Sequence, residues 1–173
     1  MRLKIILFLF MVLPFSAINA QSLSEGYRLY KQKQYNEASE IFKKLSDEGS
    51  HKAQTRLGFM YYKGLGVKKD FEKAVKYYKL AEKKNNRAAI TNLGWMYQRG
   101  WGVTQNLKLS SELYLKAAKM NHSPAQNKIA ESYEFGRGVT KDYVQALEWY
   151  EKAFKNGYKK AKMRIVRVKE KLN

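Results

Sequence analysis

Histidine is the side chain best suited to proton transfer near neutral pH, and this sequence of 173 residues has two of them. His51 and His122 are far apart in the chain, and neither has a second histidine four residues away on the same helical face. Each stands near the expected start of a helix. We therefore interpret both as exposed helix-start residues rather than as catalytic groups or metal ligands.

The other residues that could do chemistry do not form a known catalytic pattern. The sequence has no cysteine, which excludes disulfides, thiolate metal sites and cysteine nucleophiles. It has no Gly-x-Ser-x-Gly, His-Glu-x-x-His or Ser-x-x-Lys motif, so the arrangements typical of serine hydrolases, metalloproteases and serine β-lactamases are absent. We expect a non-enzymatic protein that binds no cofactor and no metal.

One glycine-containing stretch occurs three times. Gly64, Gly100 and Gly136 stand 36 residues apart, and each opens a Gly-x-Gly-Val segment. A phosphate loop would need a third glycine and a preceding strand, which these segments lack. Glycine just after a helix readily takes the left-handed conformation that ends it. The segments therefore predict helix ends, and Asp70 and Asp142, which follow them, predict N-caps of the next helix.

The residues around these glycines repeat with the same period and show the i, i+3, i+4, i+7 apolar spacing of amphipathic helices. A fixed period of 36 residues indicates stacked two-helix units, each of which buries its apolar face only against its neighbours. Small residues recur where two helices must approach closely. They are Ala53, Gly58, Ala89, Gly94, Ala125 and Ala130.

The pattern divides the chain into units at about 21–50, 51–86, 87–122 and 123–158, followed by a capping helix in 159–173. The first unit differs, because its two helices are joined by a shorter link through Lys31–Gln34. Basic side chains cover much of the last helix. We expect this helix to be a solubilising cap, since a terminal repeat must present a wetted outer face.

The segment from Ala53 to Ala81 reads A-x-x-x-L-G-x-x-Y-x-x-G-x-G-V-x-x-D-x-x-x-A-x-x-Y-Y-x-x-A and is repeated twice with conservative changes. This pattern resembles the Sel-one-like repeat, a relative of the tetratricopeptide repeat, and the first unit resembles a tetratricopeptide unit. The resemblance implies an all-α, right-handed α-solenoid of antiparallel helix pairs with a concave groove. It also implies an adaptor that binds a protein or peptide.

The N-terminus predicts export. Arg2 and Lys4 precede an apolar run from Ile5 to Phe15, and a small residue, Ala20, offers a cleavage site. This order is typical of a secretory signal peptide over residues 1–20. The alternative is an uncleaved membrane anchor, for which the run is short. We expect a periplasmic or secreted mature chain without a transmembrane segment.

In tetratricopeptide-like stacks the first helices line the concave face, and that geometry assigns candidate groove residues by position. The groove is expected to be aromatic at its N-terminal end and acidic towards its C-terminal end, with tyrosine and tryptophan as interface anchors. The alternative is that the rings only pack between helices. The candidates are Tyr27, Tyr30, Thr55, Phe59, Tyr62, Thr91, Trp95, Gln98, Asn127, Glu131 and Glu134.

Trp101 lies between two glycines of the second repeat, so its indole either anchors a partner or folds over its own loop.

The formal charge of +19 favours a second hypothesis for the function, electrostatic binding of an anionic envelope polymer through the lysine-rich surface. Nucleic acid is not expected, given the export signal and the absence of a recognised nucleic-acid module. A third hypothesis is that the protein is a β-lactam or cell-wall hydrolase. It comes from the resemblance, because cysteine-rich secreted members of the family are linked to β-lactams.

Overall fold

The computed structural model describes the backbone of residues 15–173 and the side chains of residues 21–173. Within this range it contains nine α-helices and no strand, so the predicted all-α fold is confirmed. The helices are α1 Phe15–Lys31, α2 Tyr35–Asp47, α3 His51–Lys63, α4 Phe71–Glu82, α5 Arg87–Arg99, α6 Leu107–Lys119, α7 Ser123–Phe135, α8 Tyr143–Lys155 and α9 Ala161–Lys169.

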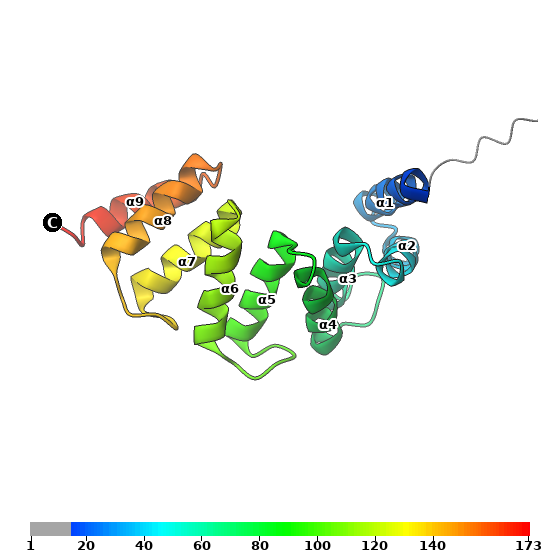
Figure 1. Ribbon diagram of the computed structural model, residues 1–173, viewed down its shortest axis with the longest axis horizontal. Coiled ribbons are helices and arrows are strands. Elements are labelled where there is room, and N and C mark those ends of the chain that lie inside the picture. Colours follow the sequence, from blue (N-terminus) through cyan, green and yellow to red (C-terminus); the bar gives the residue numbers. More distant parts are fainter. Residues whose placement is uncertain (1–14) are drawn as a thin grey trace, which may run out of the picture.

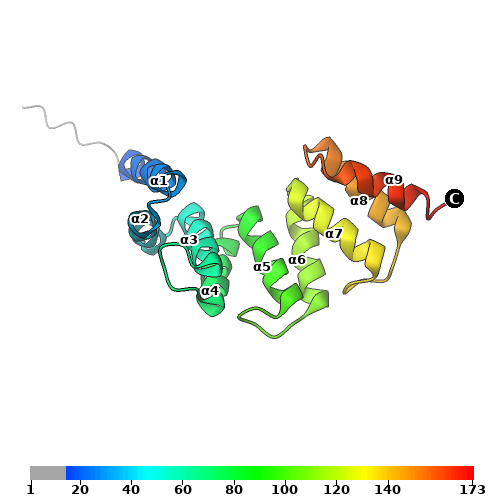
Figure 2. The same ribbon diagram turned by 180° about the vertical axis from the view of Figure 1, so that it is seen from behind.

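The helices form a solenoid of consecutive pairs. Each helix packs mainly against the helix before it and the helix after it, and the pairs follow one another along an arc (Figure 1). The second helices α4, α6 and α8 lie on one face of the arc. Turning the molecule brings α3, α5, α7 and α9 to the front (Figure 2). We call this second side the first-helix face.

The ends of the helices are specified locally, as the repeat predicts. Asp70, Asn106 and Asp142 each accept a hydrogen bond from the backbone amide three residues on, at 2.9, 2.9 and 3.0 Å. Gly64 ends α3 with a φ of 73° and donates its amide to the Met60 carbonyl at 2.7 Å. Because each repeat contains its own capping residues, the helices begin at the same positions in every 36-residue repeat and end at the same or neighbouring positions.

Within each of the three 36-residue repeats, a small residue on the first helix faces a buried tyrosine on the second. A Cβ on Gly58 would lie 2.8 Å from the Tyr78 ring, and one on Gly94 would lie 2.8 Å from the Tyr114 ring. Tyr78, Tyr114 and Tyr150 are all almost fully buried. The small residues therefore bring the two helices close enough for one tyrosine per repeat to fill the space between them.

Adjacent units are joined through the second glycine of each loop. Gly102 of the second repeat lies against the start of α4, where an added Cβ would be 2.4 Å from the Phe71 backbone. Gly66 and Gly138 make the same approach to Tyr35 and Leu107 in the units before them. The loops thus stack each repeat on its predecessor.

The two ends of the chain differ from the repeats between them. Residues 1–14 of the predicted signal peptide lie outside the described residues, and α1 begins at Phe15. The predicted cleavage site after Ala20 is therefore inside α1, and cleavage stays a prediction. No helix in the described part of the chain combines the length and apolarity needed to cross a membrane. At the other end, α9 buries Ala161 and Val168 against the last repeat.

Candidate functional site

Three adjoining pockets run along the first-helix face, and together we call them the groove. The first, of about 250 Å³, is lined from α1, α3 and α5. The second, of about 440 Å³, is lined from α3, α5, α6, α7 and the loop after α8. The third, of about 430 Å³, is lined from α5, α7 and the loops beside them. Phe59 lines both of the first two pockets, and Trp95 and Lys128 line both of the last two. Neighbouring pockets therefore share walls and lie side by side along this face.

In the first pocket, predicted aromatic residues surround an arginine. The Arg56 guanidinium lies 5.0 Å from the ring centroid of Tyr27 and 4.7 Å from that of Tyr30. Phe59 is on the other side, at 5.9 Å. Thr55 donates its hydroxyl to the His51 carbonyl at 2.8 Å, so this hydroxyl is already partnered within α3. The first pocket therefore combines ring faces with two cations, Arg56 and Lys52, that form no ion pair in the described part of the chain.

The second pocket has an aromatic floor made by two repeats. Tyr62 of α3 and Trp95 of α5 meet edge to face, with ring centroids 5.0 Å apart. Both side chains are only partly buried, and Phe59, Pro124 and Tyr158 complete the apolar lining. The rings therefore pack between neighbouring first helices and also line an open pocket, and their role as interface anchors stays a prediction.

Trp101 folds back on the cluster rather than projecting into solvent. Its indole is stacked 5.2 Å from the Phe71 ring and 5.7 Å from the Tyr62 ring, and it meets Trp95 at 4.7 Å. It therefore covers the start of α4 and supports the pocket floor from behind. Its role as an anchor for a partner stays a prediction.

The third pocket is polar and basic. The Tyr114 hydroxyl donates a hydrogen bond to Gln98 Oε1 at 3.0 Å, and the Gln105 side-chain amide donates one to the Gln98 backbone carbonyl at 2.9 Å. Arg99, at the end of α5, and Arg137, in the loop after α7, border the pocket. Gln98 is thus held by the fold, and the arginines supply the charge.

Thr91 links the groove to His122. Its hydroxyl lies 2.8 Å from His122 Nδ1 and 2.8 Å from the Arg87 carbonyl, and Thr91 itself is largely buried. Burial, together with the nearby Arg87 guanidinium, lowers the pKa of His122 to about 4. His122 therefore packs as a neutral ring, which corrects the interpretation of it as an exposed residue.

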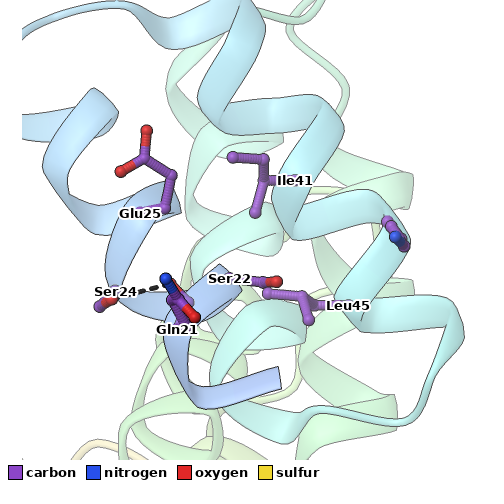
Figure 3. A pocket seen from close by; sticks show the side chains of 7 residues that line it. Gln21, Ser22, Ser24, Glu25, Ile41 and Leu45 are labelled. Carbon is purple, nitrogen blue, oxygen red and sulfur yellow. Dashed lines mark hydrogen bonds between the residues drawn. The ribbon is translucent and has the colours of Figure 1, made fainter. Parts of the chain in front are cut away.

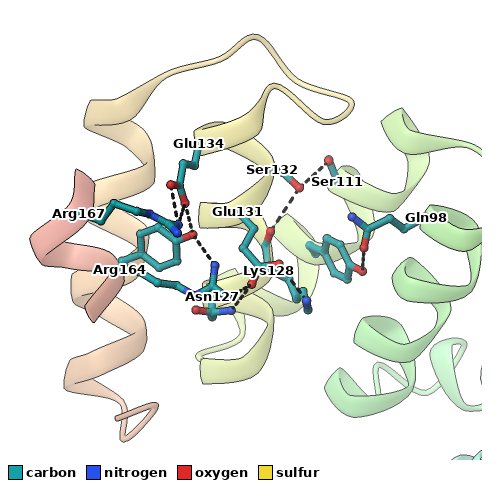
Figure 4. A network of polar contacts seen from close by, with 11 residues as sticks. Gln98, Ser111, Asn127, Lys128, Glu131, Ser132, Glu134, Arg164 and Arg167 are labelled. Atoms are coloured by element: carbon teal, nitrogen blue, oxygen red, sulfur yellow. Dashed lines mark hydrogen bonds and ion pairs between the residues drawn. The ribbon is translucent and has the colours of Figure 1, made fainter. Parts of the chain in front are cut away.

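The expected acidic end of the groove is not formed. Glu131 and Glu134 are only 7% and 5% exposed, and Asn127 is 1% exposed. Arg164 of α9 lies 2.9 Å from the Glu131 carboxylate, and Arg167 lies 2.6 Å from that of Glu134 (Figure 4). The carboxylates are paired with α9 because this helix takes the position that a further first helix would occupy.

The same network adds neutral donors to both carboxylates. Tyr150 donates its hydroxyl to Glu134 at 2.7 Å, and Asn127 donates its amide to Glu131 at 3.0 Å. Lys128 lies 2.9 Å from Glu131 and also borders the groove. The cap is therefore more than the solubilising surface expected from the sequence, since two of its basic residues satisfy buried acids.

The groove cations were missed by the sequence reasoning. Arg56, Arg99 and Arg137 do not share one repeat column, so the periodicity that located the aromatic candidates gave no signal for them. A charged residue in a chain this basic is also easily assigned to the solvent-exposed surface. The groove lining distinguishes these three arginines, together with Lys52, Lys63 and Lys128, from the remaining basic residues.

Another pocket lies outside the groove, between α1 and α2 at the N-terminal end of the arc. It has a volume of about 560 Å³ and is bordered by Glu25, Ile41 and Leu45 (Figure 3). None of the predicted groove residues lines it. Among the described residues there is also no group of three His, Cys, Asp or Glu that could hold a metal ion.

The Sel1 repeat family model matches three segments of the chain, residues 51–86, 87–122 and 123–158. No match is found among curated protein sequences. A solved Sel1 repeat protein from Oxalobacter formigenes is 38% identical, with a TM-score of 0.78 over 83% of this chain. The match spans 58% of that protein's length.

A second solved structure is cysteine rich protein B (HcpB) of Helicobacter pylori. It is 25% identical, with a TM-score of 0.58 over 71% of this chain and 93% of the other. The chain described here has no cysteine. Its helix pairs are therefore held by packing and capping without disulfides.

Proposed function

The chain belongs to the Sel1 repeat family, whose helical repeats are typically protein-interaction modules, and we propose that it is an exported, non-enzymatic adaptor. Its partner, a protein or a peptide, binds in the groove of the first-helix face. One observation carries the proposal. Tyr62 and Trp95, from two different repeats, form the floor of a pocket that remains open to solvent.

The floor is suited to binding because its rings are already held in place. Each ring contacts at least one other ring of the cluster, so little side-chain freedom is lost when a partner docks. Aromatic side chains that are rigid and partly exposed are the residue types that most often dominate interface energies. Export is proposed from the N-terminal residues alone.

Crosslinking of the tagged protein in its own cells, followed by recovery at low and high salt, tests the adaptor role. We expect a discrete partner that is kept at high salt and lost with Trp95→Ala. Trp149→Ala, the same change on the second helix α8, is the matched control and should keep the partner. Equal recovery with both variants would refute the groove as the binding site.

The lysine-rich surface supports a second candidate function. Lys119, Lys152 and Lys155 border a pocket of about 330 Å³ beside α6 and α8, away from the first-helix face. Such a cluster suits an anionic envelope polymer, and its binding should weaken steeply as salt rises. Recovery of polyanions alone, lost at high salt and insensitive to Trp95→Ala, would favour this function over the adaptor.

Cell fractionation tests export separately. The protein should be found in the periplasm or the medium, with an N-terminus near Gln21 by terminal sequencing. A cytosolic protein that keeps its first residues would contradict export while leaving the adaptor function open.

A further inference from the structure

Three arginines border the groove, and each rests on an aromatic ring. The Arg56 guanidinium lies 4.7 Å from the Tyr30 centroid, that of Arg99 lies 5.4 Å from Trp101, and that of Arg137 lies 4.8 Å from Phe135. In the described part of the chain, none of the three forms an ion pair with a carboxylate. Their charges are oriented by the rings but remain unneutralised.

The groove lining is free of acidic residues. No Asp or Glu is among the described residues that border its three pockets, although the chain contains 15 of them. The two that the sequence placed there, Glu131 and Glu134, are withdrawn into pairs with Arg164 and Arg167. A ligand in the groove therefore meets positive charge along its length and no competing carboxylate.

Aromatic rings form the middle of the groove between two ends bordered by arginine, and Lys63 and Lys128 are the cations of the middle pocket. Arg56 lies in the first pocket, the Tyr62 and Trp95 rings form the floor of the second, and Arg99 and Arg137 border the third. A guanidinium binds a carboxylate through two parallel hydrogen bonds, which selects planar acids over diffuse negative charge. The rings of the second pocket favour an apolar side chain on the ligand, because such a side chain is stabilised when it leaves water.

We infer that the partner segment is an extended acidic peptide, with a central aromatic or aliphatic side chain between flanking Asp or Glu residues. The central side chain packs on Tyr62 and Trp95, and the flanking carboxylates pair with the groove arginines. A uniformly charged polymer would satisfy the arginines but leave the ring faces unused. This inference rests on the proposed function, because it names the chemistry of the partner in the same groove.

Selection from a random peptide display library on the purified full chain tests the inference. Enriched peptides should carry several Asp or Glu residues around one apolar residue. A labelled peptide from the selection is then compared with its Glu-to-Gln and Asp-to-Asn counterpart by fluorescence anisotropy. The amide counterpart should bind about tenfold more weakly, because paired charges are replaced by neutral hydrogen bonds.

Two double variants with the same change in net charge locate the contact. Arg99→Gln with Arg137→Gln removes two groove cations that have no carboxylate partner in the fold. Lys152→Gln with Lys155→Gln removes two from the second-helix side. The first variant should weaken the acidic peptide about tenfold and the second much less, with circular dichroism checking that both are folded.

The outcomes separate the two proposals. Neutral peptides that bind in a Trp95-dependent way would overturn the acidic partner while supporting the adaptor. Equal weakening by both double variants would also overturn it, since it would indicate diffuse attraction. If the selection gives no peptide whose binding is weakened by Trp95→Ala, both proposals are overturned.

Discussion

The Arg167 guanidinium of α9 lies 2.6 Å from the Glu134 carboxylate of α7. Tyr150 of α8 donates its hydroxyl to the same carboxylate at 2.7 Å, so three helices converge on one nearly buried acid. The pair connects the cap to the last repeat. It also removes from the groove a charge that would otherwise repel an acidic ligand.

Replacing Arg167 with alanine should destabilise the protein by about 1.5–3 kcal/mol, because Glu134 would lose its charged partner while staying buried. Urea unfolding measures the difference. Lys169→Ala is the matched control in the same helix, since Lys169 pairs at 3.2 Å with the exposed Glu151. The control should cost less than about 1 kcal/mol. Equal losses would mean that the Arg167 pair contributes no more than a surface contact.

Gly102→Ala should be far more damaging than Gly157→Ala. Both glycines have positive φ, 67° and 90°, but only Gly102 has a neighbouring backbone within reach, at 2.4 Å from a built Cβ. We expect the free energy of unfolding to fall by about 1 kcal/mol for Gly157→Ala, from backbone strain alone. For Gly102→Ala we expect it to fall by about 3 kcal/mol or more. Similar unfolding midpoints would contradict the proposed stacking of each loop on the preceding repeat.

The ring cluster should show measurable coupling. In a double-mutant cycle, Trp101→Ala and Tyr62→Ala should couple by about 1 kcal/mol, because the two rings stack across a repeat boundary. Ile41, on α2 in the first unit, supplies the control. Trp101→Ala with Ile41→Ala should be additive. A Trp101–Tyr62 coupling near zero would show that the stacked geometry does not contribute to stability.

The stability should depend on His122 between about pH 4 and pH 6.5. The pKa of His122 is lowered to about 4 from an unfolded value of 6.5, so in this window the unfolded chain binds a proton that the folded chain does not. Acidification therefore destabilises the fold, and the stability is regained as the pH rises through this window. Partial exposure reduces the effect to on the order of 1 kcal/mol.

Thermal unfolding of the wild type and His122→Asn across this pH range checks the effect. Asparagine does not titrate, and Asn86 fills the matching position before α5, where it caps Ala89 at 3.0 Å. The stability of the wild type relative to the variant should rise from pH 4 to 6.5. A constant difference would rule out a buried neutral His122.

Much of the fold was predictable because its determinants are local. The Gly-x-Gly-Val segments, the caps at Asp70 and Asp142 and the small residues facing Tyr78 and Tyr114 each act within one repeat. The position of a residue within the 36-residue repeat therefore predicted its local conformation. Tyr62 and Trp95 could be assigned to the first-helix face in the same way.

Other features depended on contacts between units and could not be derived from spacing. Glu131 and Glu134 occupy positions that suggested an acidic groove, but their exposure depends on where α9 docks. Trp101 had two possible positions, and the choice depended on Phe71 of the preceding repeat. The absence of acidic side chains from the groove lining likewise depends on the docking of α9.

The sequence by itself determined the repeat, the helix boundaries and the aromatic candidates, because capping and periodic burial act over a few residues. The tertiary structure decided which charges face the groove. Ion pairing and burial join residues more than 30 positions apart, such as Glu134 and Arg167, and their geometry exists only once the helices are stacked.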